Sequence, residues 1–397
     1  MRGARTDDFD FDLPEGLIAQ VPLARRDASR LLILSRMDGA VSHVTVADLP
    51  RWLRAGDLLV LNDTRVLPCR LYARRASGAR LEFLLLRPEA GVREGGAGQR
   101  REASLTWRAL VRPLRRVRVG EALALEGGVY TSPVGASPAS GEPGAVPAAA
   151  LASTPPADAT PARAPDARVR VRAVCGDGEV VVAFEGPMAE EAGVRGILDA
   201  CGAVPLPPYI RAPLTDPERY QTVYGRVEGS AAAPTAGLHF TPELLAAVRA
   251  AGIATAMVTL HVGLGTFRPV TVERPEEHRM HAEWFCVPEA TSAAVEACRT
   301  RGGRVVAVGT TVLRTLEARV DAEGRIAPGE AWTDLYVLPG WRFRAVDGLL
   351  TNFHLPRSTL LMLVSAFAGR ERVLAAYREA VRLRYRFFSF GDAMLVI

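Results

Sequence analysis

Residues 242–266 read PELLAAVRAAGIATAMVTLHVGLGT, and they carry the pattern that decides the fold. An amphipathic run from 242 to 251 is followed by Gly252, a typical helix terminator. The run from Ile253 to Leu260 is rich in β-branched residues, which favours a strand. The same order recurs from 288 to 308, where an amphipathic run precedes Gly302 and the apolar residues 305–308. Helices and strands that alternate in this way predict an α/β domain.

Polar motifs follow several of the predicted strands. Strands are predicted at 30–34, 41–46 and 57–61, and the last of these leads into NDTR at 62–65. Further along the chain, strands at 253–260, 305–308 and 349–350 lead into HVGLGT (261–266), GTT (309–311) and TNFH (351–354). In open α/β sheets, ligands bind beyond the carboxyl ends of the strands. We therefore expect these motifs to line one pocket if their strands share a sheet.

The segment between residues 69 and 187 has a different pattern. Short alternating runs at 80–86, 107–111, 117–125, 169–174 and 179–184, without helices between them, predict a small antiparallel β-barrel. The fold class is therefore α/β: a discontinuous α/β main domain, formed by 1–68 and 188–397, with the barrel inserted at 69–187. Residues 131–167 are almost wholly Ala, Pro, Ser, Thr and Gly. Because they cannot bury enough apolar surface, we expect a disordered loop there.

Composition excludes several classes of protein. The chain of 397 residues has no lysine, which rules out Schiff-base enzymes, pyridoxal enzymes and lysine-containing phosphate loops. Its five cysteines are scattered and form no Cys-x-x-Cys pair, so neither a disulfide framework nor a zinc ribbon is expected. No run approaches the roughly 20 apolar residues that span a bilayer, and residues 1–12 lack the apolar core of a signal peptide. We expect a cytoplasmic protein with no membrane partner.

Positive charge is concentrated within the predicted barrel. The net charge is +5, and Trp107 lies beside five arginines in 108–118. Four of these are candidates for contacts to RNA phosphates, with Trp107 as a stacking residue: Arg112, Arg115, Arg116 and Arg118. An ordinary solvated strand face would have the same composition in a chain whose only strong base is arginine, and the sequence does not decide between the two.

Histidine and asparagine are concentrated in the strand-end motifs. Five of the six histidines lie in the second half of the chain, where they suit either acid/base chemistry or metal binding. The spacing of His278, His281 and Glu283 does not match the zinc-protease pattern and falls in a predicted loop, so no metal is expected. The only two asparagines, Asn62 and Asn352, lie in motifs that follow predicted strands. They are either chemically required or serve as turn residues.

These motifs closely resemble one family, the S-adenosylmethionine:tRNA ribosyltransferase-isomerases of queuosine biosynthesis. The resemblance covers most of the chain and rests on RDASRLL (26–32), GDLLVLNDTRV (56–66), PLPPYI (205–210), YQTVY (220–224), APTAGLHF (233–240), TLHVGLGTF (259–267), GTT (309–311), TNFHLP (351–356) and YRFFSFGDAM (385–394). Arg357 and Phe390 depart from the family's usual lysine and tyrosine. So many motifs in the same order make the resemblance specific.

The resemblance implies that the ribosyl group of S-adenosylmethionine is transferred and isomerised onto 7-aminomethyl-7-deazaguanine at the tRNA wobble position. Adenine and methionine would leave, and epoxyqueuosine would form. The catalytic candidates are then His239, His261, His354, Asp63 and Glu317. The substrate-binding candidates are Asn62, Arg65, Gly263, Gly265, Thr310, Thr311, Arg314 and Asn352. The Arg314 and Glu317 side chains, three apart on one helical face, could instead form an intrahelical ion pair.

The implied partners are S-adenosylmethionine as co-substrate and a tRNA with a GUN-type anticodon carrying the 7-deazaguanine precursor. No cofactor is expected, and the protein is expected to be a monomer. Two other classes remain open at this point. A metal-dependent hydrolase would use the clustered histidines as ligands, and a non-catalytic RNA-binding protein would need only the basic barrel.

Overall fold

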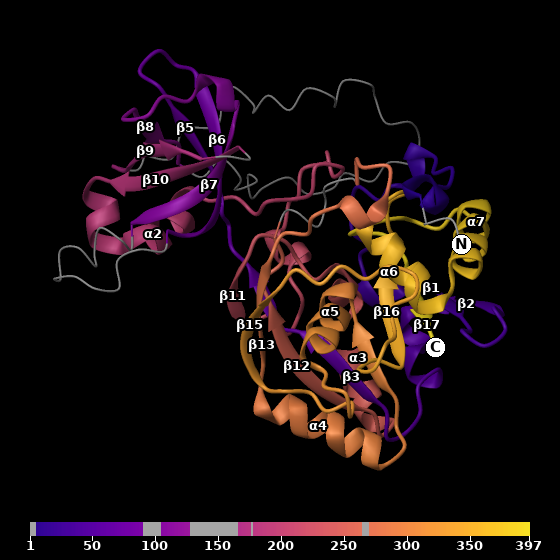
Figure 1. The fold of residues 1–397 in the computed structure, drawn as a ribbon. Coiled ribbons are helices and arrows are strands. Elements are labelled where there is room, and N and C mark those ends of the chain that lie inside the picture. The colour runs from indigo at the N-terminus through magenta and orange to yellow at the C-terminus, as the bar shows by residue number, and fades with distance from the viewer. Residues whose placement is uncertain (1–4, 90–104, 128–165, 176–177, 264–269) are drawn as a thin grey trace, which may run out of the picture. The chain divides into compact units, whose positions relative to one another are not determined.

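A computed structural model describes residues 5–89, 105–127, 166–175, 178–263 and 270–397 (Figure 1). The chain divides into two compact units, one formed by Met1–Leu67 with Leu206–Ile397 and the other by Pro68–Pro205. The second boundary therefore lies after helix α2 (Pro187–Cys201), whereas the sequence placed it before that helix. The α/β class with an inserted antiparallel barrel is confirmed.

The first unit is built on a sheet in which the described residues contribute nine strands. Their order is β15-β13-β12-β3-β14-β16-β17-β1-β2. The strand bounds are β1 (Arg30–Leu34), β2 (Val41–Thr45), β3 (Leu58–Asn62), β12 (Ala254–Leu260), β13 (Glu283–Val287), β14 (Val305–Val308), β15 (Gly329–Thr333), β16 (Gly348–Asn352) and β17 (Ala393–Val396). A separate two-stranded sheet pairs β4 (Thr64–Val66) with β11 (Val227–Ser230).

Four neighbouring strands, β12, β3, β14 and β16, are parallel, so their carboxyl ends meet at one edge of the sheet. The register aligns Val258 with Asn62 and Val308 with Leu350. β17 runs antiparallel to β16 and parallel to β1, which brings the beginnings of β17 and β1 to the same edge. The predicted strand-end motifs are therefore gathered on one side of the unit.

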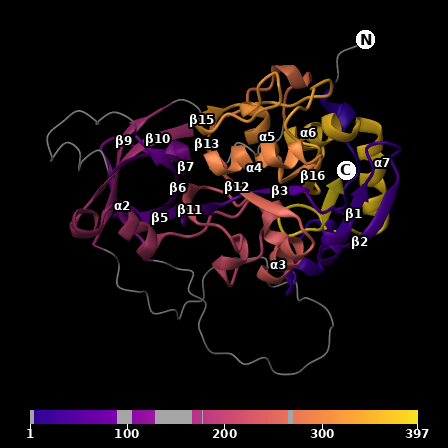
Figure 2. The ribbon, with the colours of Figure 1, turned by 90° about the horizontal axis from the view of Figure 1, so that it is seen from below.

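Helices cover both faces of this sheet. The helix bounds are α3 (Pro242–Ala250), α4 (Glu289–Thr300), α5 (Thr310–Arg319), α6 (Thr359–Ala368) and α7 (Arg370–Arg382). Short 3-10 helices are η1 (Thr6–Phe9), η2 (Glu15–Leu17), η3 (Arg26–Ala28), η4 (Val46–Arg51), η8 (Pro217–Tyr220), η9 (Thr235–His239) and η11 (Pro275–Glu277). Figure 2 shows α4 and α5 on one side of the sheet and α3 on the other.

The side chains of β3 point alternately to the two faces of the sheet, which explains why a hydrophobic core lies on each face. Leu58 and Val60 pack into the core beneath α4 to α7, whereas Leu59 and Leu61 pack into the core beneath η4 and α3. Side chains of a strand point alternately to the two faces, so a strand covered on both faces must be apolar at every position. All five residues of β3 are buried and the first four are apolar, while the polar Asn62 stands at the end of the strand.

Local capping confirms the helix that opens the quoted sequence. The Thr241 hydroxyl accepts a hydrogen bond from the Leu244 amide at 3.0 Å, and Pro242 occupies the first helical turn. Gly252 follows the helix with a φ of +76°, in the region that glycine adopts without strain. The helix therefore begins and ends where the sequence predicts.

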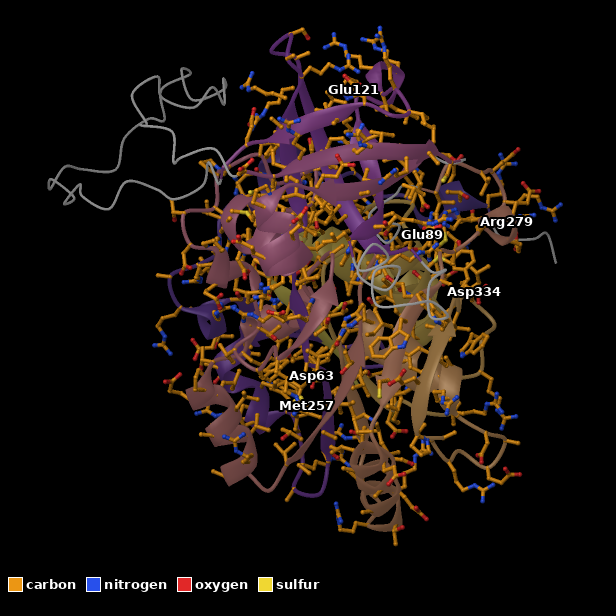
Figure 3. All side chains as sticks on the ribbon, turned by 90° about the vertical axis from the view of Figure 1, so that its left-hand side faces the viewer. Asp63, Glu89, Glu121, Met257, Arg279 and Asp334 are labelled. Atoms are coloured by element: carbon orange, nitrogen blue, oxygen red, sulfur yellow. The ribbon has the colours of Figure 1, made fainter. Side chains whose placement is uncertain are left out.

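The second unit is a closed barrel of antiparallel strands in the order β10-β7-β6-β5-β8-β9. Its elements are β5 (Arg70–Arg74), β6 (Arg80–Pro88), β7 (Thr106–Arg112), η5 (Leu114–Arg116), β8 (Ala122–Leu125), β9 (Arg168–Val174), β10 (Glu179–Glu185) and α2. Glu121 lies near one end of the barrel and Glu89 near the other (Figure 3). The strand predicted from 117 begins only at Ala122.

Most of the predicted loop 131–167 lies outside the described residues. Its last residue, Ala167, is described and lies directly before β9, where it is buried and its carbonyl accepts a hydrogen bond from the Leu125 amide. Among the described residues, no helix is both long enough and apolar enough to cross a bilayer.

Candidate active site

A pocket opens at the carboxyl ends of the parallel strands. Its empty space, counted out to the mouth, is about 670 Å³. The lining residues are Tyr209, Ala233, Pro234, Thr235, Ala236, Val262, Gly309, Thr310, Thr311, Thr351, Asn352, Phe353, His354, Leu355, Ser358, Leu360, Phe388 and Ser389. We call this the strand-end pocket. It brings together four residues that the sequence selected from two separate motifs: Thr310, Thr311, Asn352 and His354.

The N-terminus of α5 forms one wall of the strand-end pocket. Gly309 precedes the helix with a φ of +97°, and its amide is already bonded to the Leu350 carbonyl. The first-turn amides of a helix have no intrahelical partners and carry a partial positive charge, so they can hold a carboxylate or phosphate. Among the described residues, the Thr311 hydroxyl has no hydrogen-bond partner. This wall is therefore suited to an anionic group.

Asn352 presents an oriented acceptor. Its Nδ2 donates to the Phe388 carbonyl at 3.0 Å and bonds to Nε2 of His239 at 3.2 Å. Since a carbonyl can only accept, the Phe388 contact fixes which end of the amide is the nitrogen. Both amide hydrogens are thus used, while Oδ1 has no partner among the described residues. A buried acceptor without a partner costs about 1–3 kcal/mol, which a ligand donor could recover.

His354 and His239 are kept uncharged at neutral pH. His354 lines the strand-end pocket, and its Nε2 bonds to the Thr351 hydroxyl at 2.8 Å. Burial lowers the pKa of His354 to about 3. His239 lies outside the pocket lining but contacts Asn352, and burial lowers its pKa to about 4 despite an opposing hydrogen bond to the Arg26 backbone. Neither imidazole adds positive charge to the pocket.

Acidification should therefore destabilise the fold between pH 6.5 and about 4. His239 and His354 have folded-state pKa values below the ordinary value of 6.5, so in this window the unfolded chain binds more protons. Stability is fully present above pH 6.5 and is lost as the pH falls, by up to about 1.4 kcal/mol per pH unit for each histidine. Urea unfolding at half-unit pH steps measures this slope. His354→Gln should reduce the slope, and an unchanged slope would refute a neutral His354.

A second group of predicted residues lies between β3, β4 and β12. Asp63 follows β3 and lies beside β12, close to Met257 (Figure 3). Its carboxylate accepts from the Thr259 hydroxyl at 2.6 Å and from Nε of Arg226 at 2.7 Å. These contacts hold the buried carboxylate in one orientation.

His261 adjoins this carboxylate. Its Nδ1 bonds to the Thr64 hydroxyl at 2.8 Å, and its ring stacks on Trp284 with centroids 4.8 Å apart. Burial lowers the pKa of His261, and the Asp63 charge opposes that shift. A Cβ added at Gly229 would lie 2.5 Å from Nε2 of His261, so only glycine fits against the ring. The next residue, Val262, lines the strand-end pocket.

Arg314 is held in a buried ion pair, not by the carboxylate three residues later. Its Nη1 donates to Glu283 at 2.5 Å, and its Nε donates to the Leu335 carbonyl at 3.0 Å. Both charged side chains are almost wholly buried, and the other Glu283 oxygen accepts from the Gly263 amide at 2.8 Å. The pair therefore fixes the turn after β12, while Nη2 of Arg314 has no hydrogen-bond partner among the described residues. The anion contact of Arg314 stays a prediction.

Glu317 is also structural. Its carboxylate accepts hydrogen bonds from the amides of Arg344 and Ala345 and from the Trp341 indole, and it does not line the strand-end pocket. The predicted role as a base or sulfonium-facing carboxylate is replaced by anchorage of the loop 341–345. The alternative of an Arg314–Glu317 ion pair is wrong as well, because the two side chains bind different elements.

Asn62 likewise serves the fold. Its Nδ2 donates to the Leu260 carbonyl at 3.0 Å, and its Oδ1 accepts from the amides of Leu260 and Thr64. The side chain is wholly buried and ties the end of β3 to the end of β12. Asn62 therefore serves as a turn residue, which was one of the two alternatives, and does not make the predicted substrate contact. Arg65 is ion-paired with Glu218, and Gly265 lies outside the described residues.

Among the residues of the strand-end pocket that the sequence did not select, two aromatic residues lie side by side. The Tyr209 hydroxyl bonds to the Ser389 hydroxyl at 2.7 Å, and the Tyr209 ring lies 4.8 Å from the Phe388 ring. Phe388 has a φ of +70°, which is uncommon for a bulky residue, and its carbonyl is the one that orients Asn352. Both lie within motifs that carry the family resemblance, although no single-residue signal selects them.

The predicted RNA-binding arginines lie in the barrel unit. The side chains of Arg112, Arg115, Arg116 and Arg118 are exposed, and among the described residues none has an acidic partner within ion-pair distance. The neighbouring Arg108 differs, because it is ion-paired with Glu89 and Glu179. Trp107 is half-buried on β7.

The chain is similar to proteins of one family along almost its whole length. A family model described as "Queuosine biosynthesis protein" matches residues 6–396. The chain is 49% identical over 397 residues to the S-adenosylmethionine:tRNA ribosyltransferase-isomerase of Moorella thermoacetica, covering 99% of this chain and 100% of that one. It is 48% identical to the protein of the same name from Anaeromyxobacter dehalogenans, with 99% of each chain covered. A crystal structure of S-adenosylmethionine tRNA ribosyltransferase from Thermotoga maritima is 34% identical, with 98% of this chain and 100% of that chain covered and a TM-score of 0.49.

Proposed function

Because this chain belongs to the queuosine biosynthesis protein family, we propose that it is an S-adenosylmethionine:tRNA ribosyltransferase-isomerase. The acceptor is 7-aminomethyl-7-deazaguanine at the wobble position of the tRNA anticodon. The ribosyl group of S-adenosylmethionine is transferred and isomerised, giving epoxyqueuosine in the tRNA and releasing adenine and methionine. The strand-end pocket, with its oriented Asn352 acceptor beside the N-terminus of α5, is the observation that carries this proposal.

The chemistry of the donor matches the walls of the strand-end pocket. S-adenosylmethionine has a carboxylate, which the first turn of α5 can hold, and several N–H and O–H donors, which Asn352 Oδ1 can accept. Its sulfonium is a cation and would be repelled by a protonated imidazole. The low pKa values of His354 and His239 keep both rings neutral, so the pocket tolerates this cation.

Proton transfer is assigned to His261, near the strand ends. The sulfonium acidifies the adjacent 5′ carbon, and a base within hydrogen-bond reach can remove a proton there. Burial lowers the pKa of His261, and the Asp63 charge partly opposes this shift, so His261 is the candidate that can both accept and return a proton. His354 lines the pocket, but its pKa of about 3 makes its ring a weak base, suited to hydrogen bonding and not to proton removal. Adenine also needs a proton as it leaves, and His261 can return one.

The proposal also covers the type of tRNA, the oligomeric state and the location of the protein. We expect tRNAs with GUN-type anticodons as acceptors, a monomeric protein and a cytoplasmic location. Light scattering during gel filtration tests the monomer, and competition among unmodified transcripts with different wobble bases tests the anticodon preference. The reaction requires no metal or bound cofactor, so dialysis against a chelator should leave turnover unchanged.

The decisive experiment measures free adenine. The protein is incubated with S-adenosylmethionine and a tRNA that carries 7-aminomethyl-7-deazaguanine, and adenine is quantified by chromatography. We expect adenine in proportion to modified tRNA, with none released from tRNA that carries guanine at that position. Absence of adenine from the complete mixture would end the proposal. Turnover that depends on an added metal would favour the hydrolase alternative.

Removing a barrel arginine should weaken tRNA binding in a salt-dependent manner. Arg116→Gln removes an exposed cation on η5, and each lost phosphate contact lowers the log–log slope of affinity against salt by about 0.7 for single-stranded RNA. Filter binding between 50 and 250 mM salt measures the slope. Arg325→Gln, an exposed arginine of the other unit, is the control. Equal slopes for both variants and the wild type would exclude Arg116 from the interface.

A further inference from the structure

A smaller pocket shares Ser389 with the strand-end pocket. Its empty space is about 270 Å³, and its lining residues are Pro22, Leu23, Arg26, Ser29, Arg219, Leu238, His239, Ser389, Phe390 and Gly391. We call it the arginine pocket. His239, one of its lining residues, bonds to Asn352 of the strand-end pocket. The two hollows are therefore linked by a shared serine and by a hydrogen bond between their walls.

Backbone carbonyls fix the two guanidinium groups of the arginine pocket. Arg26 donates to the Leu238 carbonyl at 3.2 Å and to the Glu218 carbonyl at 2.8 Å. Arg219 donates to the carbonyls of Ala24 at 3.0 Å and Leu23 at 2.5 Å. Among the described residues, neither guanidinium has a carboxylate within ion-pair distance. Carbonyl acceptors orient a guanidinium but leave its charge uncompensated.

A third arginine adds to this positive charge. Arg386 bonds to the Val21 carbonyl, beside the arginine pocket, and its Nη1 has no partner among the described residues. Burial lowers the pKa of Arg386, Asp392 opposes this shift, and Arg30 adds to it. Burial likewise lowers the pKa of Arg26, followed by repulsion from Arg219. Like charges held this close together are a cost to folding that an anion would offset.

The carboxylates near the arginine pocket already have partners. Glu218 is ion-paired with Arg65, and Asp392 with Arg30. Asp216 accepts from the Glu218 amide as the cap of η8. They partly oppose the field of the arginines, but none of them lines the arginine pocket. An anionic ligand is therefore the complement that the pocket lacks.

We propose that the arginine pocket binds a phosphate of the tRNA backbone adjoining the nucleotide whose base enters the strand-end pocket. This inference rests on the proposed function. Ser389 separates the two hollows, so a base in one would place a neighbouring phosphate at the other. Guanidinium groups fit phosphate oxygens through two parallel N–H donors, and Ser389 adds a hydroxyl where the two hollows meet.

The carboxylate of S-adenosylmethionine is the other anion that such a site could take. The structure favours the phosphate, because the first turn of α5 already provides a binding place for the carboxylate in the strand-end pocket. The wobble nucleotide also lies in a single-stranded loop, where recognition depends on phosphate contacts and splayed bases. Separate KM values for tRNA and for S-adenosylmethionine distinguish the two anions.

Three variants test the arginine pocket: Arg219→Gln, Arg219→Lys and, as a control, Arg249→Gln at the exposed end of α3. Arg219→Gln should raise the KM for tRNA roughly tenfold and lower the salt slope by about 0.7, with the KM for S-adenosylmethionine unchanged. Arg219→Lys should restore the slope because it restores the charge. The control should match the wild type in both KM values.

The lysine variant gives a second measurement that does not depend on turnover. Since the natural chain has no lysine, Arg219→Lys has a single side-chain amine. Bound tRNA should protect this amine from acylation, as read by mass spectrometry, whereas S-adenosylmethionine alone should not. Protection by S-adenosylmethionine, or a raised KM for S-adenosylmethionine in Arg219→Gln, would assign the pocket to the carboxylate and overturn the proposal.

Two further outcomes would also overturn the phosphate site. One is an Arg219→Lys variant with the same KM for tRNA, salt slope and lowered melting temperature as Arg219→Gln. Arg219 would then only hold the 21–26 segment in place. The other is an unaltered salt slope in Arg219→Gln. Both are read against a wild-type protein that releases adenine, so they differ from failure of the proposed function, in which the wild type itself releases none.

Discussion

Asn352→Ala should lower kcat/KM for adenine release about 100-fold, the scale seen when one oriented polar group is removed from an active site. Alanine removes the unpartnered Oδ1 and also the donor that holds the Phe388 carbonyl. The Tyr209–Phe388 side of the strand-end pocket would lose its fixed position at the same time. Adenine release under conditions of limiting S-adenosylmethionine measures the change.

Asn62→Ala is the matched control, because it changes the chain's other asparagine at the end of a neighbouring strand. This variant leaves the Leu260 amide, the Leu260 carbonyl and the Thr64 amide without partners, at about 1–3 kcal/mol for each buried group. We expect a lower melting temperature with kcat/KM per folded molecule close to the wild type. If Asn352→Ala also lost only stability, the strand-end pocket would not be the site of the reaction.

Glu283→Gln should destabilise the protein by about 3–5 kcal/mol, because it leaves the charge of Arg314 buried without a counter-charge. The same change removes the anionic acceptor of the Gly263 amide, which fixes the turn after β12. Guanidinium unfolding followed by tryptophan fluorescence measures the loss. Trp284 and Trp332, paired on β13 and β15, report directly on this part of the sheet.

The double variant Glu283→Leu with Arg314→Met separates lost packing from the unpaired charge. Replacing both partners with apolar residues removes the buried charge, so most of the lost stability should return. Arg325→Gln breaks an exposed ion pair and should have little effect. A Glu283→Gln variant as stable as the wild type would mean that water reaches this pair and that its burial does not govern stability.

Local sequence patterns were sufficient to predict the strands and helices that surround the strand-end pocket. β-branched runs bounded by turn residues predicted β1, β3, β12 and β14 to within a residue or two, because these signals act over a few positions. The start of α5 after Gly309 was predictable for the same reason. The strand-end rule then brought Thr310, Thr311, Asn352 and His354 into one pocket.

The partners of single polar side chains could not be predicted. Arg314 and Glu317 have the spacing of an intrahelical pair, yet Arg314 bonds to Glu283 on β13 and Glu317 to the loop 341–345. Asn62 and Asn352 gave the same local signal, but the register of β3 on β12 brings the Leu260 backbone within reach of Asn62 alone. Such partners are set by tertiary packing and lie outside any sequence window.

The position of β17 in the sheet has a consequence for how the first unit folds during synthesis. It pairs with β1 on one side and β16 on the other, and the hydrogen bond from Arg30 to Asp392 joins positions 362 apart. The β1–β2 hairpin is synthesised early but must wait for residues 393–396 before it can dock. Until then it presents an open strand edge, the kind of surface on which nascent chains associate wrongly. Chaperone holding of this hairpin during translation would raise the yield of native protein.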